Sequence, residues 1–505
     1  MPQVLTVLLT TTPDIIDPAK TNLIPSYTVF SLIVSTLVAF DHDLKIVPYL
    51  AESWEASGDE LTWTFQIRRG VRFHDGTPVN AEAVAWSLNR FRTEGLLRGF
   101  LAPIREVVAV GEYVVEIRLH EVFPLLLQEL AIEYVGIVSP AAVEKYGVEH
   151  GIKNMVGSGP FKFYEFIHGD RAVVVRNEEY VWGPAFVKNR GPAHLERIIF
   201  RVVPEAATRI MELERGRAVY TGAIPTGDIL RLKADPNIQA METLWRGSAS
   251  LTINVTKWPL SDVRIRRALN HAVDRDIIIE HVLDGFAVRA YSNFSPAQVG
   301  FYAGVKKIAY EFDPQKAREL FAEAGWSPGP DGILIHRETG TRAEFELWVA
   351  TIEERIRASE VIKAQLREIG VDLRLTVKEG GAIVAGWRRV PPVHDMLFRQ
   401  YGWPIVDGAL HTIYHSGNIG AGNASHLAYE PMDELVGIVK AHPDPAVRAR
   451  ALKEAQMLSV KLATEIPLWH PISFAMATAD VGGVELLAAH PWWSRRVFAL
   501  DLYVR

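Results

Sequence analysis

The sequence predicts a layered α/β protein. Beyond residue 247, helical and extended patterns alternate along the chain, which is typical of domains built from packed layers of helices and strands. Two of the helical patterns end at glycines, Gly325 and Gly370, which suit the left-handed backbone that closes a helix. The chain shows no internal repeat of roughly 20–50 residues and no linker rich in Pro, Gly or Ser. Solenoids and strings of separate small domains are therefore disfavoured.

The first elements follow from local patterns. Val4–Thr10 is a short β-type run that breaks where Pro13-Asp14 favours a turn. The apolar stretch Ser26–Phe40 is predicted to form one buried helix. Leu61–Arg68 alternates its side chains with period two, which predicts a half-buried strand. Asn80 precedes a helical pattern, and we expect it to cap that helix because its side-chain oxygen can accept a hydrogen bond from the first turn.

Strands and helices alternate in the rest of the chain. Extended segments are expected at 173–176, 198–203, 248–255, 332–335, 371–377 and 396–402, and helices at 205–214, 262–272, 314–324 and 358–369. The second of these helices carries Arg264, Arg266 and Arg267 close to acidic residues. Pairing along a helix face predicts that these arginines form a solvated face of ion pairs rather than a phosphate site.

Composition narrows the class of protein. A chain of 505 residues suggests two to four domains of about 150 residues each. Hydrophobic residues make up 48% of the chain, which excludes a disordered protein. The net charge of −6 comes without a basic stripe, so nucleic acid is not an expected partner. The absence of cysteine excludes disulfides, thiol nucleophiles and cysteine-bound metals.

No segment reads as a membrane span or as an export signal. The longest apolar runs, 27–40 and 123–138, are interrupted by polar residues or Pro and fall short of the ~20 residues that a span needs. Met1–Leu5 lacks the basic and apolar regions of a signal peptide. We therefore expect either a cytoplasmic protein or an exported one whose signal is missing from this sequence.

Four stretches in order along the chain carry a resemblance. They are Leu61–Phe65 with Arg69–Pro78 and Asn80–Glu82, then Gly157–Phe161, then Asn254 with Asp262–Arg275, and last Asp313–Leu320 with Ala322–Gly325, followed by Gly402-Trp403. Together they resemble the extracytoplasmic solute-binding proteins of peptide and nickel ABC importers. The resemblance spans most of the chain.

The resemblance implies a type II periplasmic-binding-protein fold with three lobes, a hinge and an interlobe ligand cleft. Lobe I would combine 1–40, 155–246 and 473–505, the second lobe would be 41–154, and the third 247–472. The hinge would lie at two crossings, near Gly247 and Ile472. The implied function is a non-catalytic receptor, expected to be a monomer without a cofactor. It would lie in the periplasm or elsewhere outside the cytoplasm and pass a small polar or anionic solute, or a short peptide, to permease subunits in the membrane.

The resemblance also suggests which residues line the cleft. Trp403 occupies a cleft-lining position of the family, and Arg389 falls where an oligopeptide binder carries a pocket arginine. On the strand before Trp403, Arg399 and Tyr401 share its face and Gln400 takes the other. Candidates elsewhere are Tyr27, which follows the loop after the first strand, and Arg246 at the presumed crossing, each of which could equally be a packing residue.

Two departures from the family pattern weaken the case for a peptide. Val406 stands where peptide binders carry an acidic residue for the peptide amine, although Asp407 follows and could substitute. No arginine stands near Ala350-Thr351, where dipeptide binders hold the peptide carboxylate. We therefore expect the solute to be bound mainly by Trp403 and cationic side chains, Arg389 first and Arg399 second.

Two alternatives remain open at this stage. His411 and His415 are spaced i and i+4, which on a helix puts both imidazoles on one face, so a nickel or metal-chelate binder of the same family is conceivable. An α/β hydrolase is the rival from another class. It lacks support, because the sequence contains no phosphate loop, GxSxG elbow or HExxH motif, and the adjacent Glu353-Glu354 would point to different faces of a helix.

Overall fold

The structure is a computed structural model that describes residues 3–41, 44–216, 218–221, 224–403, 405–442, 444–483 and 499–504. It divides into two compact units, Met1–Thr243 with Ser473–Arg505, and Leu244–Ile472. The predicted third part of lobe I, 473–505, is thus described only for 473–483 and 499–504. The division into three lobes with the boundaries given above stays a prediction.

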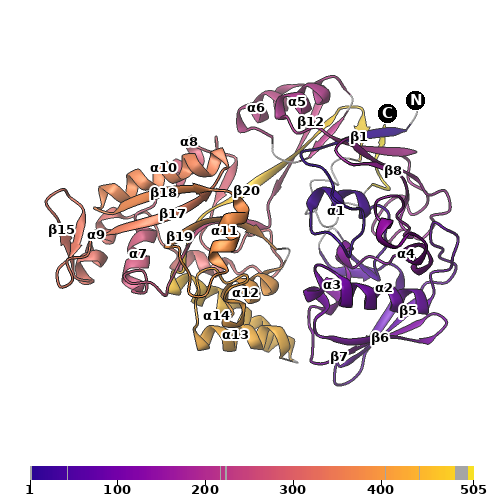
Figure 1. Cartoon of the computed structure of the whole chain (residues 1–505), viewed down its shortest axis with the longest axis horizontal. Helices are drawn as coiled ribbons and strands as arrows, with labels where there is room; N and C mark the ends of the chain where they lie inside the picture. Colours follow the sequence, from indigo (N-terminus) through magenta and orange to yellow (C-terminus); the bar gives the residue numbers. More distant parts are fainter. Residues whose placement is uncertain are drawn as a thin grey trace. The chain divides into compact units, whose positions relative to one another are not determined.

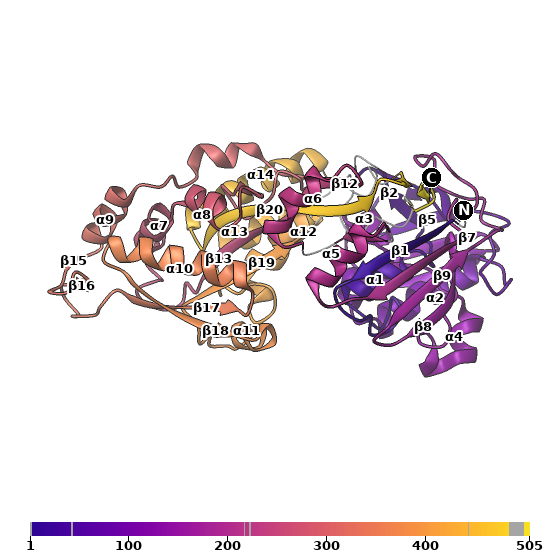
Figure 2. The same cartoon turned by 90° about the horizontal axis from the view of Figure 1, so that it is seen from above.

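Two larger sheets of the first unit can be followed in Figures 1 and 2, and the described residues add two two-stranded sheets, β2-β3 and β21-β22. The larger follows the order β20-β11-β1-β10-β9-β8, with β1 parallel to β10 and β11, and the smaller follows β4-β5-β7-β6. Near the ends of the chain, the Gln3 amide nitrogen donates to the Val504 carbonyl (2.8 Å). The strands are β1 (Val4–Leu9), β2 (Val38–Phe40), β3 (Ile46–Pro48), β4 (Ala51–Ala56), β5 (Thr62–Ile67), β6 (Ile104–Gly111), β7 (Val114–Leu119), β8 (Phe161–Ile167), β9 (Arg171–Arg176), β10 (Arg197–Val202), β11 (Val219–Thr221), β12 (Ile238–Leu244), β21 (Val481–Gly482) and β22 (Tyr503–Val504).

Six α-helices and three short 3₁₀ helices are described in this unit: α1 (Ile24–Phe30), α2 (Ala81–Glu94), α3 (Leu126–Leu130), α4 (Pro140–Tyr146), α5 (Ala206–Glu214), α6 (Thr226–Ala234), η1 (Arg98–Leu101), η2 (Glu133–Val135) and η3 (Gly147–Glu149). The predicted cap of α2 is confirmed, since the Asn80 side chain accepts a hydrogen bond from the Ala83 backbone N–H (2.9 Å). The strand predicted at 61–68 is also confirmed as β5.

The prediction of one helix over Ser26–Phe40 is wrong, because α1 ends at Phe30. Beyond it, the carbonyls of Leu32 and Ile33 accept hydrogen bonds from the backbone N–H groups of Phe161 and Gly159, at 3.1 and 2.7 Å. A Cβ at Gly159 would lie 2.5 Å from the Leu32 oxygen. A distant segment therefore satisfies these carbonyls, and only glycine allows its backbone to approach so closely.

The second unit is built on the strand order β18-β17-β19-β13-β20, with β14 on β20. Its strands are β13 (Gly247–Ile253), β14 (Ala287–Arg289), β15 (Trp326–Pro328), β16 (Leu334–His336), β17 (Glu344–Ala350), β18 (Asp372–Lys378), β19 (Met396–Gly402) and β20 (Glu465–Thr478), the last of which continues into the first unit. Its helices are α7 (Val263–His271), α8 (Arg275–His281), α9 (Pro314–Glu323), α10 (Glu353–Glu368), α11 (Gly380–Trp387), α12 (Val406–Tyr414), α13 (Glu430–Ala441), α14 (Pro445–Leu462), η4 (Ala303–Ile308) and η5 (Ser416–Asn418).

Each face of this sheet has its own core. Phe345, Leu347 and Phe398 pack into one buried cluster with α7, α9 and α10, whereas Trp348 and Leu397 on the opposite face pack with α11. Alternation along β17 and β19 thus produces the layered α/β fold that the sequence predicts.

The glycines predicted to close α9 and α10 do so, with φ of 90° at Gly325 and 86° at Gly370. Helix α10 begins at Glu353, five residues before the predicted start. The prediction of a solvated arginine face holds for Arg264, which pairs with Asp262, and is wrong for Arg266. Arg266 is only 5% exposed and donates to the backbone carbonyls of Leu260, Ser261 and Leu462. Among the described residues, no helix is both long and apolar enough to cross a bilayer.

Candidate functional site

Several of the candidate residues of the second unit lie at one edge of its sheet. Strands β17 and β19 run parallel, so their carboxyl ends, at Ala350 and Gly402, lie at the same edge. Strand β13 runs antiparallel to β19 and begins there, with Gly247 opposite Gly402. The Trp403 backbone N–H donates to the Arg246 carbonyl at 2.8 Å. Arg246 and Trp403 are therefore direct neighbours at the carboxyl-end edge, a usual place for ligand contacts in α/β sheets.

Trp403 is half-buried and held in place from several sides. Its ring packs against the apolar cluster of α12, α13 and α14. Its carbonyl accepts a hydrogen bond from the Gln298 side-chain amide at 2.8 Å. A Cβ at Gly408 would lie 2.6 Å from the Trp403 ring nitrogen, so glycine allows the first turn of α12 to reach the indole. The indole is thus fixed before any solute arrives.

Among the described residues, neither Asp407 nor Arg246 forms an ion pair, although the charge of Arg448 offsets part of the effect of burial on the pKa of Asp407. Asp407 lies in the first turn of α12 and is half-buried, and burial raises the pKa of its carboxyl to about 6. Burial lowers the pKa of the half-buried Arg246 to about 10, and its Nη1 is shielded from solvent without a hydrogen-bond partner. Each group would gain from a solute of opposite charge.

Arg399 and Tyr401 lie on the same face of β19, as predicted, but inside the unit. Arg399 is 9% exposed, and its guanidinium lies over the rings of Trp387 (4.7 Å) and Tyr401 (5.3 Å) while donating to the Gly422 carbonyl (3.3 Å). Burial raises the pKa of the Tyr401 phenol well above its usual value. These contacts are packing contacts, and the contact of Arg399 and Tyr401 with a solute stays a prediction.

The same face holds a buried carboxylate that the sequence reasoning missed. Glu465 on β20 accepts hydrogen bonds from Thr252 (2.7 Å) and Ser250 (3.0 Å), and burial raises its pKa. Arg399 offsets this negative charge. The available signal was one acidic residue at the head of the apolar run Glu465–Trp469.

Gln400 points to the opposite face, as predicted, and meets a second missed residue. Its side-chain oxygen accepts a hydrogen bond from Arg355 Nη2 at 3.2 Å. Arg355 lies in the first turn of α10, half-buried, and its Nε is shielded from solvent without a partner. An arginine thus stands at the sheet edge even though residues 350 and 351 are Ala and Thr.

Two predicted residues are not brought to this edge by any described contact. Arg389 is exposed in the loop after α11, two residues beyond Trp387. Tyr27 lies in the first unit, where it is fully buried against Phe30 and Tyr134, and its hydroxyl donates to Glu133. The packing alternative describes this placement of Tyr27, and its solute contact stays a prediction.

His411 and His415 lie near each other, as their spacing predicts. Their ring centroids are 5.1 Å apart, and both side chains are half-buried around the end of α12. His415 Nδ1 accepts a hydrogen bond from the Gly417 backbone N–H at 3.0 Å. Within the described ranges, no group of three His, Asp or Glu side chains could hold a metal ion. A metal here would need further ligands from a bound chelator.

Comparisons with known proteins agree with this architecture. Residues 45–421 match the family described as bacterial extracellular solute-binding proteins, family 5 Middle. The nickel-binding periplasmic protein of Escherichia coli strain K12 is 30% identical over 466 residues, covering 90% of this chain and 86% of that protein. Heme-binding protein A of Haemophilus influenzae is 29% identical over 474 residues, covering 87% and 81%. The crystal structure of NikA from Brucella suis in complex with Fe(III)-EDTA matches with a TM-score of 0.86 at 25% identity, covering 99% of this chain and 100% of that one.

Proposed function

Because this chain belongs to the bacterial extracellular solute-binding proteins of family 5, we propose that it is the receptor of an ABC importer for a small polar or anionic organic solute, or a short peptide. It has the α/β fold of that family, as the resemblance predicted, and it is a binding protein rather than an enzyme. The hydrolase alternative is therefore excluded. In this proposal the monomeric receptor closes about its hinge on the solute and delivers it to the permease subunits.

One observation supports this function above the others: at one sheet edge, an arginine without an ion-pair partner among the described residues lies next to a fixed indole, and a half-buried carboxyl lies in the following helix turn. Arg246 is hydrogen-bonded to Trp403 through the backbone, and Asp407 precedes Gly408, which the Trp403 ring reaches. A partly buried charge left unpaired destabilises a protein, so a fold whose described part keeps Arg246 unpaired beside an aromatic ring is suited to a polar partner that binds there. Trp403 would stack on the apolar part of the solute.

The test of this function is the recovery of an unchanged solute. Protein purified from its native host would be denatured, and the released small molecules identified by mass spectrometry. Protein freed of solute would then be titrated with the recovered compound by calorimetry. We expect Trp403→Ala to weaken binding by about tenfold or more and Trp258→Ala, a tryptophan 46% exposed elsewhere in the unit, to leave it unchanged. Turnover of the compound, or equal effects of both variants, would refute the proposal.

The same assay separates a peptide from other solutes. Val406 is fully buried, which leaves Asp407 as the carboxylate for an amine, and Arg355 supplies an arginine close to where the sequence showed none. Titration with di- to pentapeptides decides between the two solute classes. Tight binding that disappears in Asp407→Ala and persists in Arg389→Ala would identify a peptide receptor. Absence of binding to all of them would support the non-peptide solute.

A metal chelate is the second candidate, favoured by the two close imidazoles of His411 and His415. The pair could supply two nitrogen ligands, and the chelator would supply the rest. Titration with Ni²⁺ alone and with Ni²⁺ plus free L-histidine tests this. Binding that requires the added histidine and is lost in His411→Ala would favour the chelate.

We also propose that the native protein acts outside the cytoplasmic membrane, as the name of its family states. Cell fractionation of the native organism tests this. Recovery with periplasmic or surface-anchored proteins is expected, and recovery with cytoplasmic enzymes would contradict it.

A further inference from the structure

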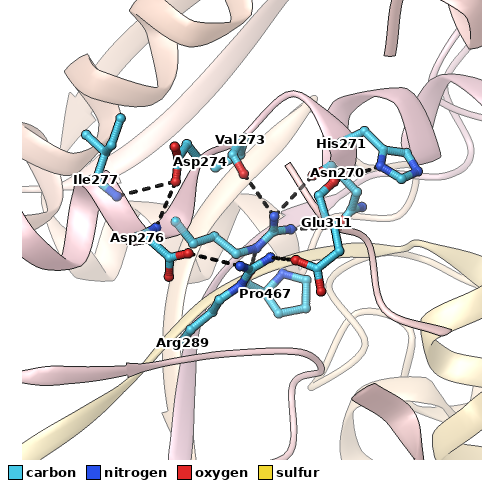
Figure 3. Close-up of polar contacts among 10 residues, drawn as sticks. Asn270, His271, Val273, Asp274, Asp276, Ile277, Arg289, Glu311 and Pro467 are labelled. Carbon is cyan, nitrogen blue, oxygen red and sulfur yellow. Dashed lines mark hydrogen bonds and ion pairs between the residues drawn. The ribbon is translucent and has the colours of Figure 1, made fainter. Parts of the chain in front are cut away.

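Arginines inside this protein normally have their guanidinium groups satisfied. Arg90 pairs with Asp17, and Arg266 donates to three backbone carbonyls. Arg275 is 3% exposed and donates to the carbonyls of Asn270, Val273 and Pro467. Arg289 bridges Asp276 and Glu311 (Figure 3). The fold thus gives each of these four guanidinium groups at least two hydrogen bonds or ion pairs when it removes them from water.

Arg246 departs from this rule. Among the arginines that are buried or half-buried in the described part of the chain, it alone shows no guanidinium contact with a carboxylate, a carbonyl, another side-chain acceptor or an aromatic ring. Burial lowers the pKa of Arg246, and no carboxylate in the described ranges forms an ion pair with it. Arg355 and Arg399, by comparison, each use the guanidinium on an acceptor and a ring.

The position of Arg246 is also fixed by the backbone. It precedes β13 directly, and its carbonyl accepts the hydrogen bond from the Trp403 N–H. The neighbouring Trp245 N–H donates to the Pro471 carbonyl of β20 at 2.8 Å. Arg246 therefore lies in the short connection between β12 and β13, and backbone hydrogen bonds hold that connection beside the predicted stacking ring.

We infer that Arg246 is the anchor for an anionic group of the solute, so that the receptor takes organic anions bearing a carboxylate or phosphate beside an apolar part. The inference rests on the proposed function and makes it more specific. A guanidinium presents several N–H donors in a planar fork that fits a carboxylate or phosphate, and such charge-assisted bonds are stronger than neutral ones. The anion would offset the charge that the folded protein leaves alone, and Trp403 would cover the adjoining apolar atoms.

A stability measurement separates this role from simple packing. If Arg246 only packs at the crossing, Arg246→Met should lower the melting temperature of the solute-free protein. If the guanidinium is held ready for an anion, removing its unpaired charge should leave that melting temperature unchanged or higher. Arg337→Met, which alters an exposed arginine of the same unit, is the matched control. A clear fall for Arg246→Met alone would overturn the inference.

Solute capture provides the second readout. Solute-free wild-type protein, Arg246→Met and Arg246→Lys are each incubated with a bacterial metabolite extract, washed, and denatured for mass spectrometry. We expect the wild type to retain organic anions, Arg246→Met to bind the retained compound about 10- to 150-fold more weakly, and Arg246→Lys to fall between.

The possible outcomes distinguish failure of the role inferred for Arg246 from failure of the proposed receptor function. If the wild type retains only neutral or cationic compounds, or if Arg246→Met retains the same anions equally well, the inference is wrong and the receptor function stands. If the wild type retains nothing from any extract or peptide, the proposed function itself fails, and the inference falls with it.

Discussion

A buried polar cluster in the first unit holds the loop between β1 and α1, and its contribution to stability can be tested by one substitution. Asp17 is fully buried and accepts two hydrogen bonds from Arg90, at 2.7 and 3.2 Å. It also accepts from the Ala19 backbone N–H (3.0 Å) and lies 3.0 Å from His150 Nδ1. Replacing Asp17 by Asn keeps the shape and removes the charge, which leaves the 6% exposed Arg90 without its buried counter-charge.

We expect Asp17→Asn to lower the free energy of unfolding by a large amount, although the substitution replaces a single oxygen. Removing one partner of a buried ion pair typically costs about 3–5 kcal/mol. Glu94 cannot replace Asp17, because its carboxylate is 67% exposed and 3.6 Å from Arg90 Nε. Urea unfolding followed by circular dichroism would measure the change in free energy of unfolding. Asp331→Asn is the matched control, since Asp331 also pairs with an arginine, Arg342, but at the surface. A loss below about 1 kcal/mol for Asp17→Asn, or equal losses for both variants, would refute the reasoning.

Asp17 should make the stability of the protein fall as the pH falls into the acid range. Although burial alone would raise it, hydrogen bonds from His150 and Arg90 hold the pKa of Asp17 well below its usual value. A carboxyl with a depressed folded pKa stabilises the protein above its unfolded pKa of about 3.9, and that stability is lost as pH falls toward the folded value. The wild type should therefore lose stability below about pH 4 more steeply than Asp17→Asn, as measured by thermal melts across a pH series.

Three further predictions follow from single contacts. Gly159→Ala should destabilise the protein by about 1–3 kcal/mol because its Cβ would meet the Leu32 carbonyl, whereas Gly58→Ala, in open space, should not; urea unfolding compares them. Asn80→Ala should cost about 1 kcal/mol through the lost cap of α2, and Asn80→Asp should retain stability in the same assay. Burial raises the pKa of Glu465, so the folded protein binds its proton more tightly and loses stability as pH rises above about 4.3. Glu465→Gln should flatten that fall in thermal melts, and a profile identical to the wild type would contradict the assignment.

Local signals predicted the elements whose causes are local. The cap at Asn80, the alternation in β5 and the terminal glycines of α9 and α10 each depend on residues a few positions apart, so one stretch of sequence contains the whole cause. The end of α1 has a cause far away in the sequence. Leu32 and Ile33 lie outside the helix because a segment about 127 residues later donates hydrogen bonds to their carbonyls, and the apolar pattern near Phe30 does not indicate that contact.

The candidate site shows the same division at the level of side chains. The alternation of β19 placed Arg399 and Tyr401 on one face and Gln400 on the other, as a period of two requires. Arg355 was missed because the start of α10 was predicted too late in the chain. The acidic pair Glu353-Glu354 favours a helix start at that point, and this start places Arg355 in the first turn, at the end of β17. Because the helix was predicted to start at residue 358, Arg355 was not placed in its first turn and was not considered as a strand-end arginine.

Residue type alone could not rank the arginines, because each can bind an anion in principle. What separates them is whether the fold already uses their donors. Arg399 is committed to two aromatic rings and a carbonyl, and it offsets Glu465, so its removal should act on stability before affinity. Arg389 is exposed to water, where an ion pair is worth little. Arg246 is neither committed nor fully hydrated, and a charge in that state gains most from a partner. The order expected from the sequence, Arg389 before Arg399, stays a prediction, and the unsatisfied donors of Arg246 are the reason we expect it to contribute more to binding than either.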